Sequence, residues 1–269
     1  MSWRLGISTG ACTHLPIVDV LPFIAAAGAA GVEIGTPPDH FDPWQEAQIV
    51  DAQRALAATR LEAVSIHAPF GGLLDLADQN AHHRYAAIGA ALTASTALQR
   101  LGGRLVVAHP SDLPRYQHDA PARLADAVRS LTVLADNCAA AGQTLLVESP
   151  LPHLIGGHPD EFAYLLDRLP TSVGVCLDTG HTTLGHYWHR FVEIAGPRLK
   201  HVHASDNHGQ RDDHLPPGLG HLDWPDLMRS LRAAQFEGWI MLELACPRTA
   251  PLDRYFHDAF ARATDLLAS

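Results

Sequence analysis

Residues 201–220 hold an unusual density of side chains that bind metal ions. His201 and His203 alternate on an apolar segment, and Asp206 follows at the point where that segment ends. The next loop adds Asp212 and His214. Imidazole and carboxylate groups are the usual protein ligands of zinc, manganese and iron. The stretch therefore predicts part of a metal site whose other ligands come from elsewhere in the chain.

Similar side chains end the other apolar segments. They are Glu33, His67, His109, Glu148, Asp178 and Glu243, with His181 a short step beyond Asp178. Charged groups are rarely buried unless they are paired or bound to metal, and neighbouring carboxylates repel one another. A divalent cation would remove that conflict. If these segments converge, the sequence predicts a metal centre at their ends.

Local spacing indicates how some of these ligands face one cavity. Between Asp178 and His181, Gly180 would allow a sharp turn. An extended backbone over residues 212–214 would place Asp212 and His214 on the same side. His201 is two positions before His203, so both side chains point to the same face of the strand and His201 lies one layer deeper. We expect it to belong to the core or to support a ligand.

The elements that carry these residues alternate regularly. Apolar segments rich in Val, Ile and Leu predict strands at 4–9, 31–36, 62–69, 104–110, 144–150, 173–181, 199–206 and 238–245. Amphipathic patterns predict helices near 17–29, 44–58, 81–101, 120–141, 159–168, 186–195, 224–235 and 252–267. Eight strand–helix rounds in 269 residues predict an α/β protein, a single (β/α)8 TIM barrel over residues 1–269. Its active site is expected at the C-terminal ends of the strands.

Composition narrows the classes of function. Hydrophobic residues make up 47% of the chain and charged residues 18%, which is typical of a globular protein. The formal net charge of -10 disfavours nucleic acid as a partner, although bound cations would offset part of it. No apolar run is long enough for a membrane span. The four cysteines are widely spaced, and the first residues lead directly into a strand, so we expect a cytoplasmic protein.

Several short segments resemble the xylose-isomerase-like TIM barrel superfamily, which includes sugar isomerases and epimerases and the endonuclease IV-like enzymes (AP endonuclease family 2). The matching segments are Ile66-His67-Ala68-Pro69-Phe70, Val107-Ala108-His109-Pro110, Val147-Glu148-Ser149-Pro150, Cys176-Leu177-Asp178-Thr179-Gly180-His181, His203-Ala204-Ser205-Asp206-Asn207, His214-Leu215-Pro216-Pro217-Gly218-Leu219-Gly220 and Leu242-Glu243. They occur in the family's order over nearly the whole chain.

The resemblance implies a central metal ion held by Glu148, Asp178, His203 and Glu243. The endonuclease-like members bind two further zinc ions. On that pattern one would lie on His67, His109 and the shared Glu148. The other would lie on His181, Asp212 and His214. The cofactor expected is therefore zinc or manganese, with iron also suited to these ligands, in one to three ions per chain.

The first functional hypothesis is a metal-dependent isomerase or epimerase of a sugar or sugar phosphate. Glu148 and Glu243 would remove and return a proton on the carbon beside a metal-polarised carbonyl. Substrate hydroxyls would then be bound by Glu33, His67, His109 and His181. The partner would be a small molecule, with a homo-oligomer as a further expectation.

The alternative is an endonuclease IV-like zinc phosphodiesterase, in which a metal cluster activates water. The absence of Lys and Arg from residues 61–83 argues against a DNA substrate, but Arg211 or Arg248 would suit a small phosphorylated one. A lyase or dehydratase would use the same ligands and bases. A Schiff-base aldolase is disfavoured, because Lys200, the only lysine, has the opposite parity to His203 and should face the helices.

Overall fold

The computed structural model describes residues 3–268, in which eight parallel strands close into a barrel with β8 hydrogen-bonded to β1. The strands are β1 (Arg4–Ser8), β2 (Gly31–Ile34), β3 (Glu62–His67), β4 (Leu105–Ala108), β5 (Thr144–Glu148), β6 (Gly174–Asp178), β7 (Leu199–Ala204) and β8 (Trp239–Leu242). Neighbours in space are neighbours in sequence, as successive strand–helix–strand units require. The predicted TIM barrel is confirmed.

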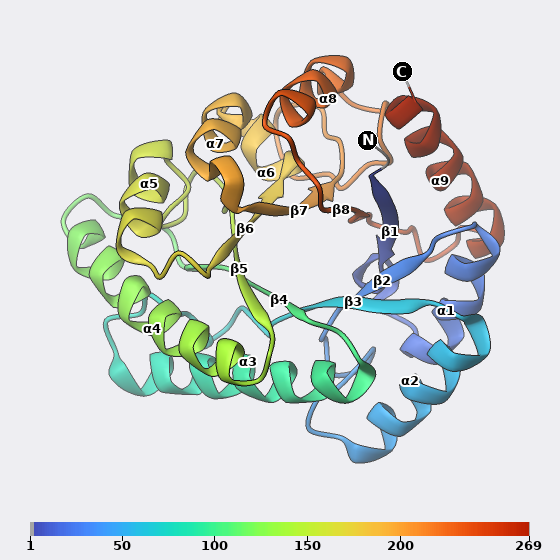
Figure 1. Ribbon diagram of the computed structural model, residues 1–269, viewed down its shortest axis with the longest axis horizontal. Coiled ribbons are helices and arrows are strands. Elements are labelled where there is room, and N and C mark those ends of the chain that lie inside the picture. Colours follow the sequence, from blue (N-terminus) through green and yellow to red (C-terminus); the bar gives the residue numbers. More distant parts are fainter. Residues whose placement is uncertain (1–2, 269) are drawn as a thin grey trace.

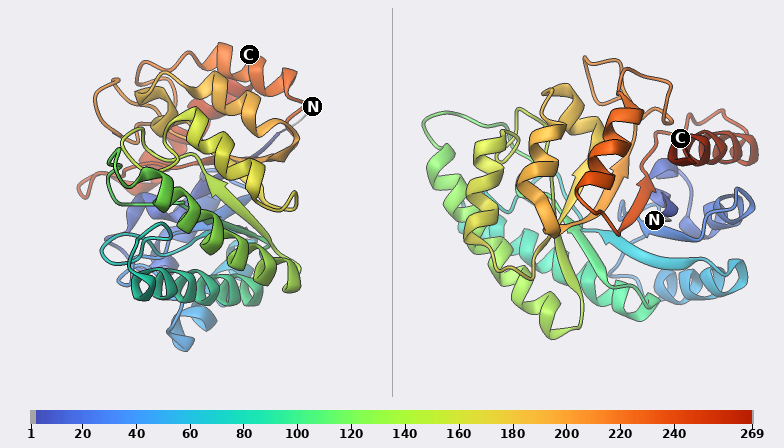
Figure 2. Two further views of the ribbon diagram at one scale, coloured as in Figure 1. Left: turned by 90° about the vertical axis from the view of Figure 1, so that its left-hand side faces the viewer. Right: turned by 45° about the horizontal axis from the view of Figure 1, so that its top comes forward.

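Helices surround the strands, as Figure 1 shows from one end and Figure 2 from two further directions. They are α1 (Ile17–Ala26), α2 (Glu46–Thr59), α3 (Ala81–Leu101), α4 (Ala120–Ala140), α5 (Pro159–Arg168), α6 (Thr179–Leu184), α7 (Trp188–Ala195), α8 (Trp224–Ala233) and α9 (Leu252–Ala268). Short 3-10 turns span Thr9–Cys12 and Gly196–Arg198. In the described part of the chain no helix has the length and apolar character needed to cross a membrane.

Helix starts follow capping chemistry that is visible in the sequence. The Asn80 side chain accepts a hydrogen bond from the His82 backbone N–H at the start of α3. Asp223 does the same for Asp226 N–H at the start of α8, where Pro225 occupies the first turn. Such caps satisfy backbone N–H groups that have no partner within the helix. Most predicted helix boundaries therefore agree with the structure to within a few residues.

The prediction for the sixth strand was wrong at its end. It extended the strand to His181, but β6 stops at Asp178 and the short helix α6 starts immediately. The Asp178 carboxylate accepts the His181 backbone N–H at 2.7 Å and so caps this helix. A polar side chain that can cap a helix ends the strand sooner than apolar content alone indicates.

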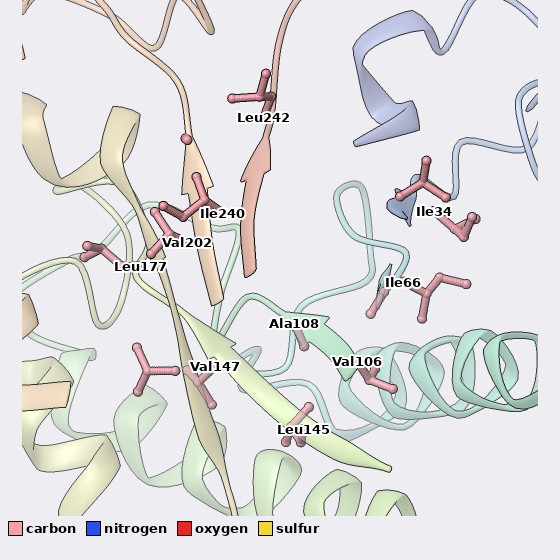
Figure 3. Close-up of a cluster of buried hydrophobic side chains, with 14 of the residues drawn as sticks. Ile34, Ile66, Val106, Ala108, Leu145, Val147, Leu177, Val202, Ile240 and Leu242 are labelled. Carbon is pink, nitrogen blue, oxygen red and sulfur yellow. The ribbon is translucent and has the colours of Figure 1, made fainter. Parts of the chain in front are cut away.

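The main hydrophobic core lies between the strands and the helices. Alternate strand residues such as Val106, Ala108 and Val147 belong to this core, and Figure 3 shows them together with Leu177 and Val202. The intervening residues point into the barrel. There, Val107, Leu146 and Cys176 form a separate apolar cluster.

Two positions further along β5 and β6, the residues that point into the barrel are charged instead of apolar. Glu148 follows Leu146 on β5, and Asp178 follows Cys176 on β6. The barrel interior is therefore apolar in one layer and polar in the next, at the C-terminal ends of the strands. Lys200 on β7 is exposed and lies outside this interior, as its parity predicts.

Candidate metal centre

Four ligand side chains meet at the C-terminal end of the barrel. Ligand atoms of Glu148, Asp178, His203 and Glu243 all lie within 4.8 Å of one another. The His203 Nδ1 atom is 3.3 Å from Glu148 Oε1, 3.0 Å from Glu243 Oε2 and 3.9 Å from Asp178 Oδ2. Three come from the ends of β5, β6 and β7, and Glu243 directly follows β8. Their convergence is a consequence of barrel closure.

A second group shares Glu148. Its Oε2 atom lies 3.0 Å from His67 Nε2 and 3.1 Å from His109 Nε2, while Oε1 faces His203. Ligand atoms of His67, His109 and Glu148 also lie within 4.8 Å of one another. The two oxygens of one carboxylate thus face two separate ligand groups, an arrangement suited to a bridge between two metal ions.

A third group contains Asp212, His181 and His214. Asp212 Oδ2 is 3.3 Å from His181 Nε2 and 2.7 Å from His214 Nε2. The two imidazole centroids are 6.5 Å apart, so this trio is looser than the other two groups. All nine predicted ligands therefore lie in one connected cluster.

The five imidazoles of the cluster share a hydrogen-bonding pattern. In each ring one nitrogen faces the cluster and the other contacts an oxygen that is not one of the predicted ligand atoms. These outer contacts are His67 Nδ1 with Ala68 O (3.0 Å), His109 Nδ1 with Asp112 Oδ1 (2.7 Å), His181 Nδ1 with Ser149 O (3.0 Å), His203 Nε2 with Glu33 Oε1 (3.0 Å) and His214 Nδ1 with Glu243 O (3.1 Å). An oxygen acceptor fixes the ring proton on the outer nitrogen, which leaves the inner lone pair available to a metal.

Several carboxylate oxygens also lack a hydrogen-bond donor. Asp178 Oδ2, Asp212 Oδ1 and Glu243 Oε2 are buried and accept no hydrogen bond from the described residues. Buried charged oxygens are costly unless a cation or a donor compensates them. The unpaired oxygens and the oriented imidazoles together fit one or more divalent cations of the zinc, manganese or iron type.

The electrostatics of the metal-free cluster reflect this crowding. Burial raises the pKa of Asp178 to about 7; His181 opposes the shift and Glu243 adds to it. Burial acts to lower the pKa of His181, but the negative charge of Asp178 and the hydrogen bond to Asp212 raise it to about 9. Protons thus occupy, in the metal-free protein, positions that cations would otherwise stabilise.

Two local expectations had the right outcome for the wrong reason. Asp212 and His214 do lie together, but His214 is not itself extended, because it adopts a left-handed conformation with φ of 46°. Gly180 is a helical residue of α6 and forms no turn. A Cβ atom there would lie 2.7 Å from Asp212 Oδ1 and 2.6 Å from Ser205 Oγ. The glycine is needed for space between ligands.

Asp206 holds the loop that carries Asp212 and His214. Its carboxylate accepts the backbone N–H groups of Gly218 and Leu222 and the indole N–H of Trp224. The backbones of Asp206 and Leu215 are also hydrogen-bonded to each other. The role of this carboxylate is therefore to fold the loop, although by sequence it looked like a further member of the ligand stretch.

A cavity of about 410 Å³ adjoins the cluster on the side of β1, β2 and β8. His67, His214 and Glu243 form its wall towards the ligand groups. Phe70 lies at the rim, half exposed, with its ring centroid 4.8 Å from that of His67 and 4.6 Å from that of His109. Pockets of this size hold small molecules.

The three predicted substrate contacts take different positions. Arg248 lines the cavity. Glu33 has no exposed surface and contacts His203 and His201, so its place is behind a ligand. The Arg211 side chain is 85% exposed and pairs with Asp213, and it does not line the cavity. Of the three predicted substrate contacts, Arg248 alone lines this cavity.

Sequence reasoning missed His14 and Phe70 as residues of the cavity. Phe70 stood within a quoted segment, directly after His67-Ala68-Pro69, and an exposed aromatic there was a usable signal. His14 belongs to the segment after β1, for which the sequence carried no ligand pattern. Its position depends on how that segment folds over the barrel end.

Comparisons with known proteins agree with this architecture. The structure of a D-tagatose 3-epimerase-like protein superposes with a TM-score of 0.87 at 20% identity. The superposition covers 98% of this chain and 97% of that protein's chain. D-allulose 3-epimerase from Methylomonas sp. gives 0.80 at 20% identity with 99% of both chains covered. The 3-keto-D-glucoside 4-epimerase from E. coli gives 0.78 at 20% identity, covering 98% of this chain and 100% of its own. At these identities the likeness concerns the fold.

Similarity to curated proteins is more limited. An uncharacterised protein of Methanocaldococcus jannaschii is 24% identical over 188 residues, which are 67% of this chain and 64% of that protein. An uncharacterised protein of Sinorhizobium fredii is 36% identical over 96 residues, 35% of this chain and 29% of its own length. The matches thus span less than two thirds of either relative. By contrast, the family described as xylose isomerase-like TIM barrel matches residues 21–264. The chain belongs to the xylose isomerase-like TIM barrel family.

Proposed function

We propose that the protein is a divalent-metal-dependent isomerase or epimerase that acts on a sugar or sugar phosphate. The observation that carries the proposal is the position of Glu243, which both belongs to the central ligand group and lines the cavity. A substrate in that cavity would have a carboxylate base and the ligand cluster on the same side. The epimerases of similar fold support this choice of reaction.

The ligands would hold the cation through Glu148, Asp178, His203 and Glu243, and a bound cation would polarise a carbonyl and its neighbouring hydroxyl. Glu243 is then the base for the proton on the adjacent carbon. Its backbone carbonyl accepts the His214 ring N–H at 3.1 Å, which fixes the residue at the cavity wall. Glu148, with a side chain 1% exposed, lies deeper, with its Oε1 atom 3.3 Å from the same His203 Nδ1 atom that faces Glu243, and we assign it the return of the proton.

The test is Glu243→Gln. We expect turnover to fall by about 10²–10⁴-fold, because the amide cannot take up a proton. The measurement is solvent-deuterium incorporation beside the carbonyl of ketoses, followed by NMR, with equal circular dichroism showing an intact fold. Glu237→Gln, at an exposed position just before β8, is the matched control and should keep full activity. Full activity of Glu243→Gln would remove the assignment of the base.

A second candidate is a multinuclear phosphoester hydrolase. It is favoured by the two further ligand groups, His67 and His109 with Glu148, and Asp212 with its two histidines. Elemental analysis of protein purified without chelator separates the candidates. One zinc or manganese ion per chain supports isomerisation, whereas three zinc ions together with cleavage of an abasic-site duplex or a small phosphodiester support hydrolysis. Protein without any divalent metal would contradict both.

A further inference from the structure

Arg248 is a cation without a partner at the wall of the cavity. The chain is acidic overall, and arginines elsewhere at this end of the barrel are paired, as Arg115 is with Glu161 and Arg211 with Asp213. Arg248 makes neither a hydrogen bond nor an ion pair with any described residue. Among the described residues that line the cavity, Glu243 is the sole acidic one. The guanidinium is therefore available to a ligand.

The backbone that carries Arg248 is held in place. Cys246 N–H donates to Ala11 O at 2.9 Å, which ties the segment after β8 to the segment after β1. Ala250 N–H donates to Pro247 O at 2.9 Å, so Arg248 occupies the second position of a tight turn. Arg248 is five positions after Glu243, a chain length that spans at most about 17 Å. The cation and the base thus belong to one short, anchored segment.

His14 adds a second nitrogen donor on the same cavity. Leu15 N–H donates to Cys12 O at 3.0 Å, which places His14 in the third position of another tight turn. The His14 ring lines the cavity and makes neither a hydrogen bond nor an ion pair within the described chain. Because Ala11 is bonded to Cys246, the turns bearing His14 and Arg248 lie on two segments fastened together.

An arginine and a histidine that form no ion pair match an anionic oxygen group, since the planar guanidinium binds phosphate or carboxylate through two parallel hydrogen bonds. We propose that Arg248 and His14 bind an anionic group of the substrate, so that the sugar carries a phosphate ester or a carboxylate. This inference rests on the proposed isomerase or epimerase activity. With its anionic group held by Arg248 and away from the Glu243 carboxylate, the substrate would be oriented with its carbonyl towards the ligand cluster.

The experiment compares neutral ketoses, their phosphate esters and the corresponding keto acids as substrates of the metal-loaded protein. Deuterium exchange beside the carbonyl gives kcat/KM for each class. We expect one anionic class to exceed its neutral parent by at least tenfold, and Arg248→Ala to reduce that ratio by at least tenfold. Which class shows the preference distinguishes phosphate from carboxylate. Arg254→Ala, on exposed α9 where Arg254 pairs with Asp258, removes the same charge outside the cavity and should preserve the ratio.

Equal ratios for wild type and Arg248→Ala would overturn the inference while leaving the isomerase proposal intact. If no sugar of any class exchanges, the proposed function fails, and binding of inorganic phosphate by calorimetry then decides the inference alone. An affinity at least tenfold weaker in Arg248→Ala than in Arg254→Ala supports an anion site at Arg248. Equal affinities overturn it, because phosphate would then bind only at the metal cluster.

Discussion

At the scale of single residues, the outer hydrogen bonds of the histidines determine how well they can bind metal. His203 is backed by the Glu33 carboxylate and His109 by that of Asp112, whereas His67, His181 and His214 donate to backbone carbonyls. A carboxylate partner makes an imidazole a stronger ligand than a carbonyl partner does. The central group and the His109 group should therefore bind their cations more tightly than the trio around Asp212.

Glu33→Gln tests this role of a buried carboxylate. The amide can still accept the His203 ring N–H but loses the negative charge, so we expect metal affinity to fall by about 10–100-fold while the protein stays folded. Competition titration against a chelator of known affinity measures the change. The exposed Glu237→Gln serves as control, and unchanged affinity in Glu33→Gln would show that Glu33 only fills space.

At the scale of elements, the direct connection from β6 to α6 brings three proposed ligands close together. Asp178 is at once a proposed ligand and the cap of α6, and His181 lies in the first turn of that helix. Gly180 lies between them, against Asp212 of a different loop. The strand end, the helix start and the β7–α8 loop are thus coupled through a position that has no room for a side chain.

Gly180→Ala should disturb this join. The added Cβ would meet Asp212 and Ser205 at less than 3 Å, so we expect weaker metal binding and a loss of about 1–3 kcal/mol in the free energy of unfolding. Gly89→Ala in α3 is the matched control, because nothing lies within 4 Å of its Cβ and alanine favours a helix by about 0.5–1 kcal/mol. Urea unfolding and metal content measure both effects. If the two variants had the same free energy of unfolding and the same metal content, the close packing around Gly180 would not contribute to stability or to metal binding.

At the scale of the whole molecule, barrel closure gathers like charges from distant parts of the sequence. If metal ions bind the folded cluster and not the unfolded chain, as we propose, they should stabilise the protein. An ion at about 1,000 times its dissociation constant contributes roughly 4 kcal/mol, which corresponds to a rise in Tm of roughly 8–16 °C for a chain of this size. Thermal unfolding with and without chelator measures the shift. An unchanged Tm, with metal shown to be removed, would contradict a resident cation.

The metal-free protein should also lose stability as pH rises. Asp178, with a pKa of about 7, and His181, with a pKa of about 9, both hold protons more tightly than in the unfolded chain. Their stabilising contributions are therefore lost as pH rises from each ordinary pKa to the raised one, between 3.8 and about 7 for Asp178 and between 6.5 and about 9 for His181. Urea unfolding of chelator-treated protein across this range should show a steady decline, and metal-loaded protein should show less of one because cations replace the protons.

The sequence by itself determined the class of fold, and it predicted a set of ligands that the structure brings together. Alternating apolar strands and amphipathic helices indicated a closed barrel, since each pattern reports which faces are buried. Strand-end residues such as Glu148 and Asp178 could be selected as ligands, because a barrel directs all its strand ends to one mouth. These are properties of local periodicity and topology, which a linear sequence carries.

Only the tertiary structure decided what each remaining polar residue does. Glu33 and Asp206 have the same residue types as the predicted ligands. Glu33 contacts His203 and so supports a predicted ligand. Asp206 accepts hydrogen bonds from the loop that follows β7 and so holds that loop in place. Arg211 and Arg248 were equivalent by sequence, and the cavity separated them. Such roles depend on distances between segments far apart in the chain. Those distances depend on how the loops fold over the end of the barrel. Loops, unlike strands and helices, have no repeating sequence pattern from which their conformation could be predicted.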